Sequence, residues 1–117
     1  MHIRIFAYIL RLVAETFGQS LSAARRAAGL SQRELAARIL KEDGEPISPQ
    51  YLNDLERDRR NPPAPHFLRQ FAEVLNLPVE YLDFVAGQLP EDLRNSGSYA
   101  PDQVQAAFRA FRRSLRG

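Results

Sequence analysis

Amide and carboxylate side chains gather on the outer face of a helix that the sequence predicts over residues 48–57. Gln50, Asn53 and Asp54 occupy that face, away from the apolar positions of the same helix. Glutamine and asparagine can bond bidentately to adenine, and a carboxylate can accept a hydrogen bond from the amino group of cytosine. Asp54 could instead repel phosphates. The pattern favours contact with DNA bases, and ordinary solvated positions are the alternative.

The sequence contains little that would support catalysis or metal binding. It has no cysteine, and its two histidines, His2 and His66, are far apart. A metal site needs several such ligands at close spacing, and the sequence offers no nucleophile–base pair or glycine-rich phosphate loop. We therefore expect a protein that is not an enzyme and holds no metal or cofactor. The lack of cysteine also fits a cytoplasmic location.

The chain of 117 residues suits one domain, and its net charge of +2 hides an uneven distribution. Basic side chains outnumber acidic ones in residues 1–60 and 101–117, whereas acidic ones outnumber basic ones in residues 61–100. Every basic residue except Lys41 is an arginine. A local basic surface attracts phosphates even where the total charge is small, so the distribution says more than the total.

Capping signals divide the middle of the chain into five predicted helices. Thr16 with Gln19, and Ser31 with Glu34, have the spacing of a capping box. Because no segment shows sustained strand alternation, we expect an all-α fold. The second helix is predicted to span residues 31–40, with its inward positions at Leu35, Ala36, Ile39 and Leu40. The five helices are predicted to begin near Thr16, Ser31, Ser48, Pro65 and Pro78.

The same patterns predict four segments. Residues 1–15 form an apolar N-terminal helical extension, 16–87 the helical domain, 88–100 a polar linker, and 101–117 a C-terminal amphipathic helix. The extension is too short to span a membrane, so we expect no membrane partner. It would be a helix packed on the domain, a segment for self-association or membrane-surface binding, or sequence translated from a misplaced start codon.

The C-terminal helix is predicted to have one apolar seam and one basic side. Val104, Phe108, Phe111 and Leu115 make the seam, and arginines populate the opposite side. Two roles are open for the seam. It folds back over the domain, or it contacts a second copy of the chain, as suits a protein that binds two half-sites related by a two-fold axis.

Three motif pieces occur in one order along the chain: GLSQRELA at 29–36, ISPQYLNDLE at 47–56 and RRNP at 59–62. Together they resemble the Cro/repressor type of helix-turn-helix family, also called the xenobiotic-response-element type. The resemblance covers about residues 16–87 and implies a five-helix, phage-repressor-like domain. It also implies a sequence-specific DNA-binding transcriptional regulator, a bacterial or phage repressor that occupies an operator through residues 48–57.

The resemblance further implies roles for particular side chains. Gln32 would touch a DNA phosphate and support the recognition helix, and Pro49 would be available to a thymine methyl group. Arg25 and Glu56 match an internal ion pair of the family that joins the first and third helices. The residues expected at the DNA are Gln32, Arg33, Ser48, Pro49, Gln50, Asn53, Asp54, Arg57, Arg59, Arg60 and Asn61.

The sequence departs from the family pattern at two places. The connection at residues 41–46 is about six residues longer than the usual short turn and carries three acids. It either extends the second helix by a turn or forms a loop near the DNA. Asp58 stands where glycine commonly closes the recognition helix, and an aspartate can adopt the left-handed conformation at modest cost.

Two other functions are compatible with these motifs. The chain could be an antitoxin that binds operator DNA and neutralises a protein toxin through residues 1–15 or 88–117. It could also be a protein-interaction adaptor that does not bind DNA. Double-stranded DNA is the expected partner, and a homodimer through either terminal segment and a separate protein partner are further alternatives.

Overall fold

A computed structural model describes residues 16–117 of the chain. The alternatives for the N-terminal extension therefore lie outside the described residues. Within them, helices account for the regular structure, apart from one isolated antiparallel β-bridge between Leu40 and Pro46. This confirms the predicted all-α class. In chain order the helices are α2 (Phe17–Ala27), α3 (Gln32–Ala36), α4 (Pro49–Glu56), α5 (Pro65–Leu75), α6 (Val79–Val85), α7 (Glu91–Asn95) and α8 (Pro101–Arg116).

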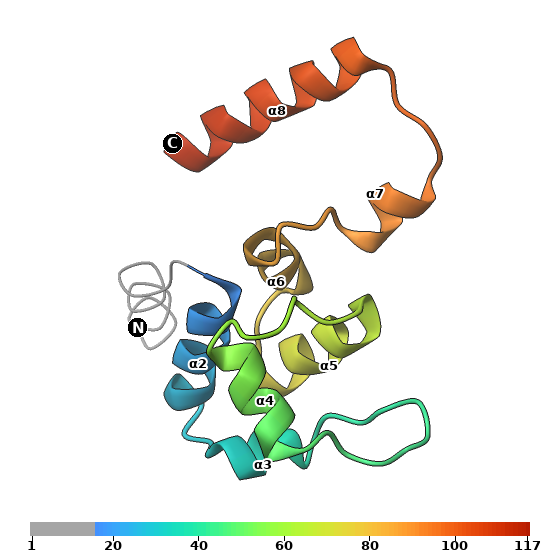
Figure 1. The fold of residues 1–117 in the computed structure, drawn as a ribbon. Helices are drawn as coiled ribbons and strands as arrows, with labels where there is room; N and C mark the ends of the chain where they lie inside the picture. The colour runs from blue at the N-terminus through green and yellow to red at the C-terminus, as the bar shows by residue number, and fades with distance from the viewer. Residues whose placement is uncertain (1–15) are drawn as a thin grey trace.

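Helices α2 to α6 surround one hydrophobic core (Figure 1). Helix α2 packs on α4 and α6, α3 packs on α4, and α5 packs on α6. Burial of apolar side chains from all five helices is the main force that holds them together. The largest fully buried apolar side chains are those of Leu21, Leu35, Ile39, Leu52, Leu55, Leu68, Phe71 and Leu82.

The first two helices begin at the predicted capping boxes. The Thr16 hydroxyl accepts from the Gln19 N–H at 3.1 Å, and the Gln19 side chain accepts from the Thr16 N–H at 3.2 Å. Ser31 and Glu34 exchange the same pair of bonds, at 3.0 and 2.9 Å. The bond from the backbone N–H of Ser31 lowers the pKa of the Glu34 carboxyl. These caps satisfy amide groups that the first turn of a helix leaves without an internal partner.

The second helix is shorter than predicted, and the expectation that Leu40 points inward is wrong. Helix α3 ends at Ala36, Ile39 remains buried, and Leu40 is 43% exposed. The reason lies in a distant residue: the Gln70 side chain accepts from the Leu40 N–H at 2.7 Å and donates to the Leu40 carbonyl at 2.9 Å. These bonds hold Leu40 in extended backbone. The long connection therefore forms a loop and does not extend the helix.

The C-terminal part of the chain lies apart from this core (Figure 1). The segment predicted as a polar linker contains the short helix α7, and every residue from Glu91 onward is exposed. Helix α8 approaches the domain through an edge-to-face contact between Phe111 and Phe84, whose ring centroids are 5.9 Å apart. On α6, Val85 is half-buried and Phe84 is 54% exposed.

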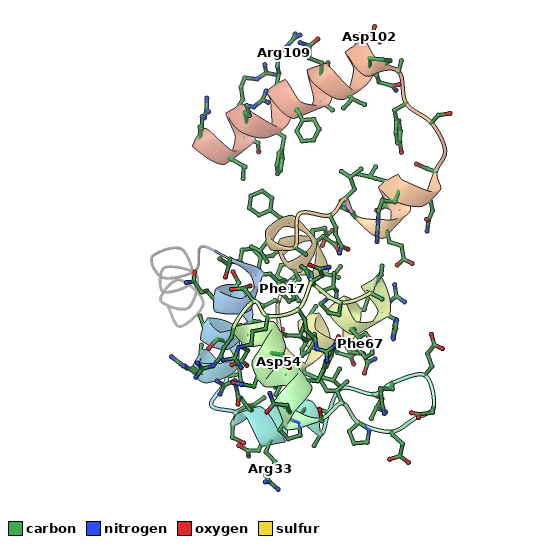
Figure 2. All side chains as sticks on the ribbon, viewed as in Figure 1. Phe17, Arg33, Asp54, Phe67, Asp102 and Arg109 are labelled. Atoms are coloured by element: carbon green, nitrogen blue, oxygen red, sulfur yellow. The ribbon has the colours of Figure 1, made fainter. Side chains whose placement is uncertain are left out.

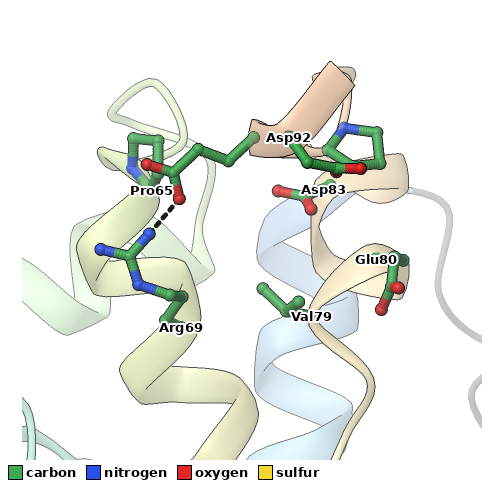
Figure 3. A pocket seen from close by; sticks show the side chains of 8 residues that line it. Pro65, Arg69, Val79, Glu80, Asp83 and Asp92 are labelled. Carbon is green, nitrogen blue, oxygen red and sulfur yellow. Dashed lines mark hydrogen bonds and ion pairs between the residues drawn. The ribbon is translucent and has the colours of Figure 1, made fainter. Parts of the chain in front are cut away.

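A small pocket of about 130 Å³ lies where α7 meets α5 and α6 (Figure 3). Arg69 and Glu91 form an ion pair across its mouth. Asp83 is only 4% exposed, and burial raises the pKa of its carboxyl, with Arg94 acting in the opposite direction. An ionised carboxylate at this position is therefore destabilised relative to one in water. In the described part of the chain, no helix is both long and apolar enough to cross a membrane.

Candidate nucleic-acid interface

The position of α4 is set by its N-terminal cap and by the apolar side chains that it buries. The Ser48 hydroxyl accepts from the Tyr51 N–H at 3.0 Å, and Pro49 occupies the first helical position. Leu52 and Leu55 are fully buried on the inner side. The two buried leucines fix the rotation of α4 about its own axis, so that its opposite side faces solvent. Gln50 is exposed on that side near the N-terminus of the helix.

A buried ion pair joins α2 to α4. The Arg25 Nε donates to Glu56 Oε2 at 2.7 Å, and Nη2 donates to Oε1 at 3.0 Å. The Arg25 Nη1 also donates to the Leu30 carbonyl at 2.8 Å, beyond the end of α2. Both charged side chains are buried, so the pairing and the additional bonds offset the cost of removing the charges from water.

Gln32 extends this arrangement from α3 to the middle of α4. Its Nε2 donates to Glu56 Oε1 at 3.0 Å and to Asn53 Oδ1 at 3.1 Å. The bond to Asn53 turns the amide oxygen of that side chain towards the protein. The Arg57 Nε donates to the same Oδ1 at 3.4 Å. The Asn53 amide NH₂ makes no hydrogen bond within the described residues, so it is available as a donor.

The side-chain amide of Gln50 is oriented the opposite way to that of Asn53. Its Nε2 donates to Asp54 Oδ1 at 3.0 Å, which leaves the amide oxygen of Gln50 as an acceptor on the exposed surface. Within one turn, α4 therefore presents an acceptor at Gln50 and a donor at Asn53. Base edges in the major groove carry both kinds of partner group.

Asp54 lies between the outer face of α4 and the arginines that follow it. Besides accepting from Gln50, its carboxylate lies 3.6 Å from Arg59 Nη1 and 3.8 Å from Arg60 Nε. Arg60 also lies over the Tyr51 ring, 5.1 Å from the centroid. Asp54 thus has protein partners on its exposed side and holds two arginines next to α4.

The remaining candidate residues differ in their surroundings. Arg33 on α3 projects into solvent, and Asp54 lies on the neighbouring surface of α4 (Figure 2). Pro49, Arg57 and Asn61 are exposed, and the hydroxyl of Ser48 is used for the cap. The structure therefore brings the candidate residues together in two sets of contacts on α4. One set joins Gln32, Asn53 and Arg57, and the other joins Gln50, Asp54, Arg59 and Arg60, whereas Asn61 is in neither.

Asp58 has a role that the sequence did not reveal. It adopts the left-handed conformation, with φ of 58°, and its carboxylate accepts from the Thr16 hydroxyl at 2.6 Å and the Gly18 N–H at 2.9 Å. The side chain that ends α4 therefore also caps the start of α2. A Cβ on Gly18 would lie 2.5 Å from the Glu56 carbonyl oxygen, so the two backbones are in direct contact. The sequence signal for this contact was that the backbone N–H groups in the first turn of α2 need acceptors from outside the helix.

Comparison with known proteins agrees with this geometry. A sequence model described as helix-turn-helix matches residues 21–82, which is more than half of the chain and runs from within α2 to within α6. No curated protein and no solved structure matches the chain. Domains of the matched family bind specific DNA sequences and are not enzymes.

Proposed function

Because the chain belongs to the Cro/repressor-type helix-turn-helix family, we propose that it is a cytoplasmic transcriptional repressor that occupies an operator through α4. In this type of domain the second helix of the motif enters the major groove and its N-terminal residues reach base edges. The observation that carries the proposal is the pair of groups on α4, where Gln50 presents an acceptor and Asn53 a donor.

Base reading is assigned to these two side chains. The Gln50 oxygen suits the amino group of adenine or cytosine, and the Asn53 NH₂ suits an acceptor such as N7 of a purine or O4 of thymine. Gln32 fixes Asn53 in this orientation before DNA arrives, so less conformational entropy is lost on binding. Pro49, at the first position of α4, is placed for apolar contact with a thymine methyl group.

Phosphate contact is assigned to the arginines around α4. Arg33 precedes the motif's second helix, and Arg57, Arg59 and Arg60 follow it, each exposed. Such contacts fix the position of the protein on the duplex but carry no sequence information. Ser48, Asn61 and the backbone at the start of α3 would add neutral contacts. Asp54 orients the arginines and keeps them from folding away from the DNA.

The decisive experiment is selection of bound duplexes from a random DNA pool. We expect the wild-type chain to enrich one consensus, and a two-fold symmetric consensus would indicate a dimer. Gln50→Ala should lose the preference for a base with an amino group at one position, a loss of about 1–3 kcal/mol of discrimination. Asn95→Ala removes an exposed amide from α7, outside the helix-turn-helix motif, and should leave the consensus unchanged.

Failure of this experiment would take one of two forms. Without any enrichment, even at low salt, the regulator proposal is wrong, and an adaptor function becomes the better account. If a consensus is found but Gln50→Ala retains it in full, the base-reading assignment of Gln50 is wrong, although the DNA-binding function stands.

A further inference from the structure

The apolar seam of α8 is exposed along its whole length. Val104, Phe108, Phe111 and Leu115 are 39%, 45%, 43% and 62% exposed, respectively. They follow one another at intervals of four, three and four residues, which is the spacing of a coiled-coil seam. A helix with this pattern stabilises a structure by packing its seam against another apolar surface.

The protein's own domain covers little of this seam. The contact between Phe84 and Phe111 leaves both rings about half exposed. The pairs of helices that make up the core involve α2 to α6, and α8 is in none of them. Figure 2 shows the α8 ribbon lying apart from the helices of the domain, with Arg109 on the side of α8 away from it. The domain therefore leaves most of the seam uncovered.

We propose that α8 pairs in antiparallel orientation with α8 of a second copy of this chain. A two-fold axis placed between positions 108 and 111 sets Val104 against the partner's Leu115, and Phe108 against the partner's Phe111. The four apolar residues of each helix are then all covered by the same four of the other. An interface of this kind is self-complementary and closed, so it stops at a dimer.

The charges on α8 favour the antiparallel orientation. Asp102 lies in the first turn, whereas Arg113 and Arg116 lie in the last turn. An antiparallel pair brings each Asp102 next to the partner's last turn, and it sets Gln105 across from the partner's Arg112. A parallel pair would instead place all the arginines of both helices at the same end, where like charges repel. The helix dipoles also oppose each other favourably when the helices are antiparallel.

The proposed pairing of α8 extends the proposed function. Its consequence for DNA recognition rests on that function. A two-fold axis through α8 relates two copies of α4, as recognition of two half-sites requires. The pairing itself is measured without DNA, so the two proposals can fail separately. A monomer that still selects a DNA consensus would overturn the dimer alone, whereas a dimer that selects no sequence would overturn the regulator alone.

Self-association of the full chain tests the pairing. Sedimentation of the wild type should show a species of twice the 13.3 kDa chain mass. Phe108→Glu should weaken association by about 30-fold or more without changing helix content, because a charge would be placed in the centre of the interface. Leu40→Glu changes an equally exposed apolar side chain in the α3–α4 loop and should leave association unaltered.

Cross-linking determines the orientation, because the chain contains no cysteine of its own. A mixture of Val104→Cys and Leu115→Cys chains should form disulfides between the two different variants when oxidised. Val104→Cys alone should form few. Abundant Val104→Cys homodimers would show a parallel pair and overturn the antiparallel assignment.

The same experiments would also reveal whether a different surface covers the α8 seam. A monomeric wild type overturns the proposal and leaves residues 1–15 or a separate protein, such as a toxin, as the cover. A dimer that persists in Phe108→Glu overturns it as well, since the contact would then lie on another surface.

Discussion

The domain formed by α2 to α6 and the C-terminal region that carries α7 and α8 use similar amino acids in opposite ways. In the domain, apolar side chains are buried together, and the charged side chains of Arg25 and Glu56 form a buried ion pair. In the C-terminal region, phenylalanines and arginines alike are exposed. The domain thus completes its own structure, whereas we propose that the C-terminal region is completed by a second copy of the chain.

The same contrast applies to polar groups. On α4, Gln50, Asn53 and Asp54 are held by bonds to other side chains of the domain. On α8, the arginines lie on a surface without such bonds in the described structure. The part of the molecule that we assign to base reading is therefore arranged in advance, and the part that we assign to assembly acquires its contacts on association.

The largest effect is expected where the domain holds its buried charge. Arg25→Ala leaves the Glu56 carboxylate buried without its partner and should lower the free energy of unfolding by about 3–5 kcal/mol. Arg109→Ala removes an exposed arginine from α8 and should change it by less than about 0.5 kcal/mol. Urea unfolding followed by circular dichroism measures both. Equal losses would show that the two regions do not differ in this way.

A smaller effect is expected at the end of α4. Asp58→Gly relieves the left-handed backbone but removes the acceptor for Thr16 and Gly18, so stability should fall by about 1–2 kcal/mol. Asn76 is the matched control, because it also has a positive φ, of 56°, at the end of α5. Asn76→Gly should leave stability unchanged or raise it slightly. A stabilising Asp58→Gly would mean that the cap on α2 contributes nothing.

The smallest effect is expected at the junction of the two regions. Because burial raises the pKa of Asp83, its ionisation opposes folding above the folded-state pKa, and this penalty disappears below the unfolded-state pKa. Asp83→Asn should therefore raise stability at pH 7, by up to about 1 kcal/mol. The two proteins should converge as the pH falls below the ordinary value of 3.8. Thermal unfolding as a function of pH measures the difference, and a constant gap would contradict the assignment.

Local signals in the sequence predicted the features that depend on neighbouring residues. Thr16, Ser31 and Ser48 cap helices from within three residues, and the family motif placed α3 and α4 in order. The contacts of the expected side chains with DNA remain predictions.

Features that depend on distant residues were beyond the sequence patterns. The end of α3 was misplaced because Gln70, thirty positions away, holds Leu40 in extended backbone. The orientation of the Asn53 amide depends on Gln32, and the cap on α2 comes from Asp58. The periodicity of apolar residues along the chain carries no information about contacts between residues so far apart in the sequence. Helix α7 was missed for a different reason, because its five residues are too few to establish a period.

The loop between α3 and α4 is closed at its base by three sets of bonds. Gln70 binds Leu40, the Lys41 N–H donates to the Glu45 carbonyl at 2.8 Å, and the Ile47 N–H donates to the Ile39 carbonyl at 2.9 Å. The tip is thereby isolated from the helices on either side. Because doubling the length of a flexible loop costs only about 0.6 kcal/mol, the tip can accept inserted residues without moving α4. It is the natural place in this molecule to attach a fluorophore or peptide tag.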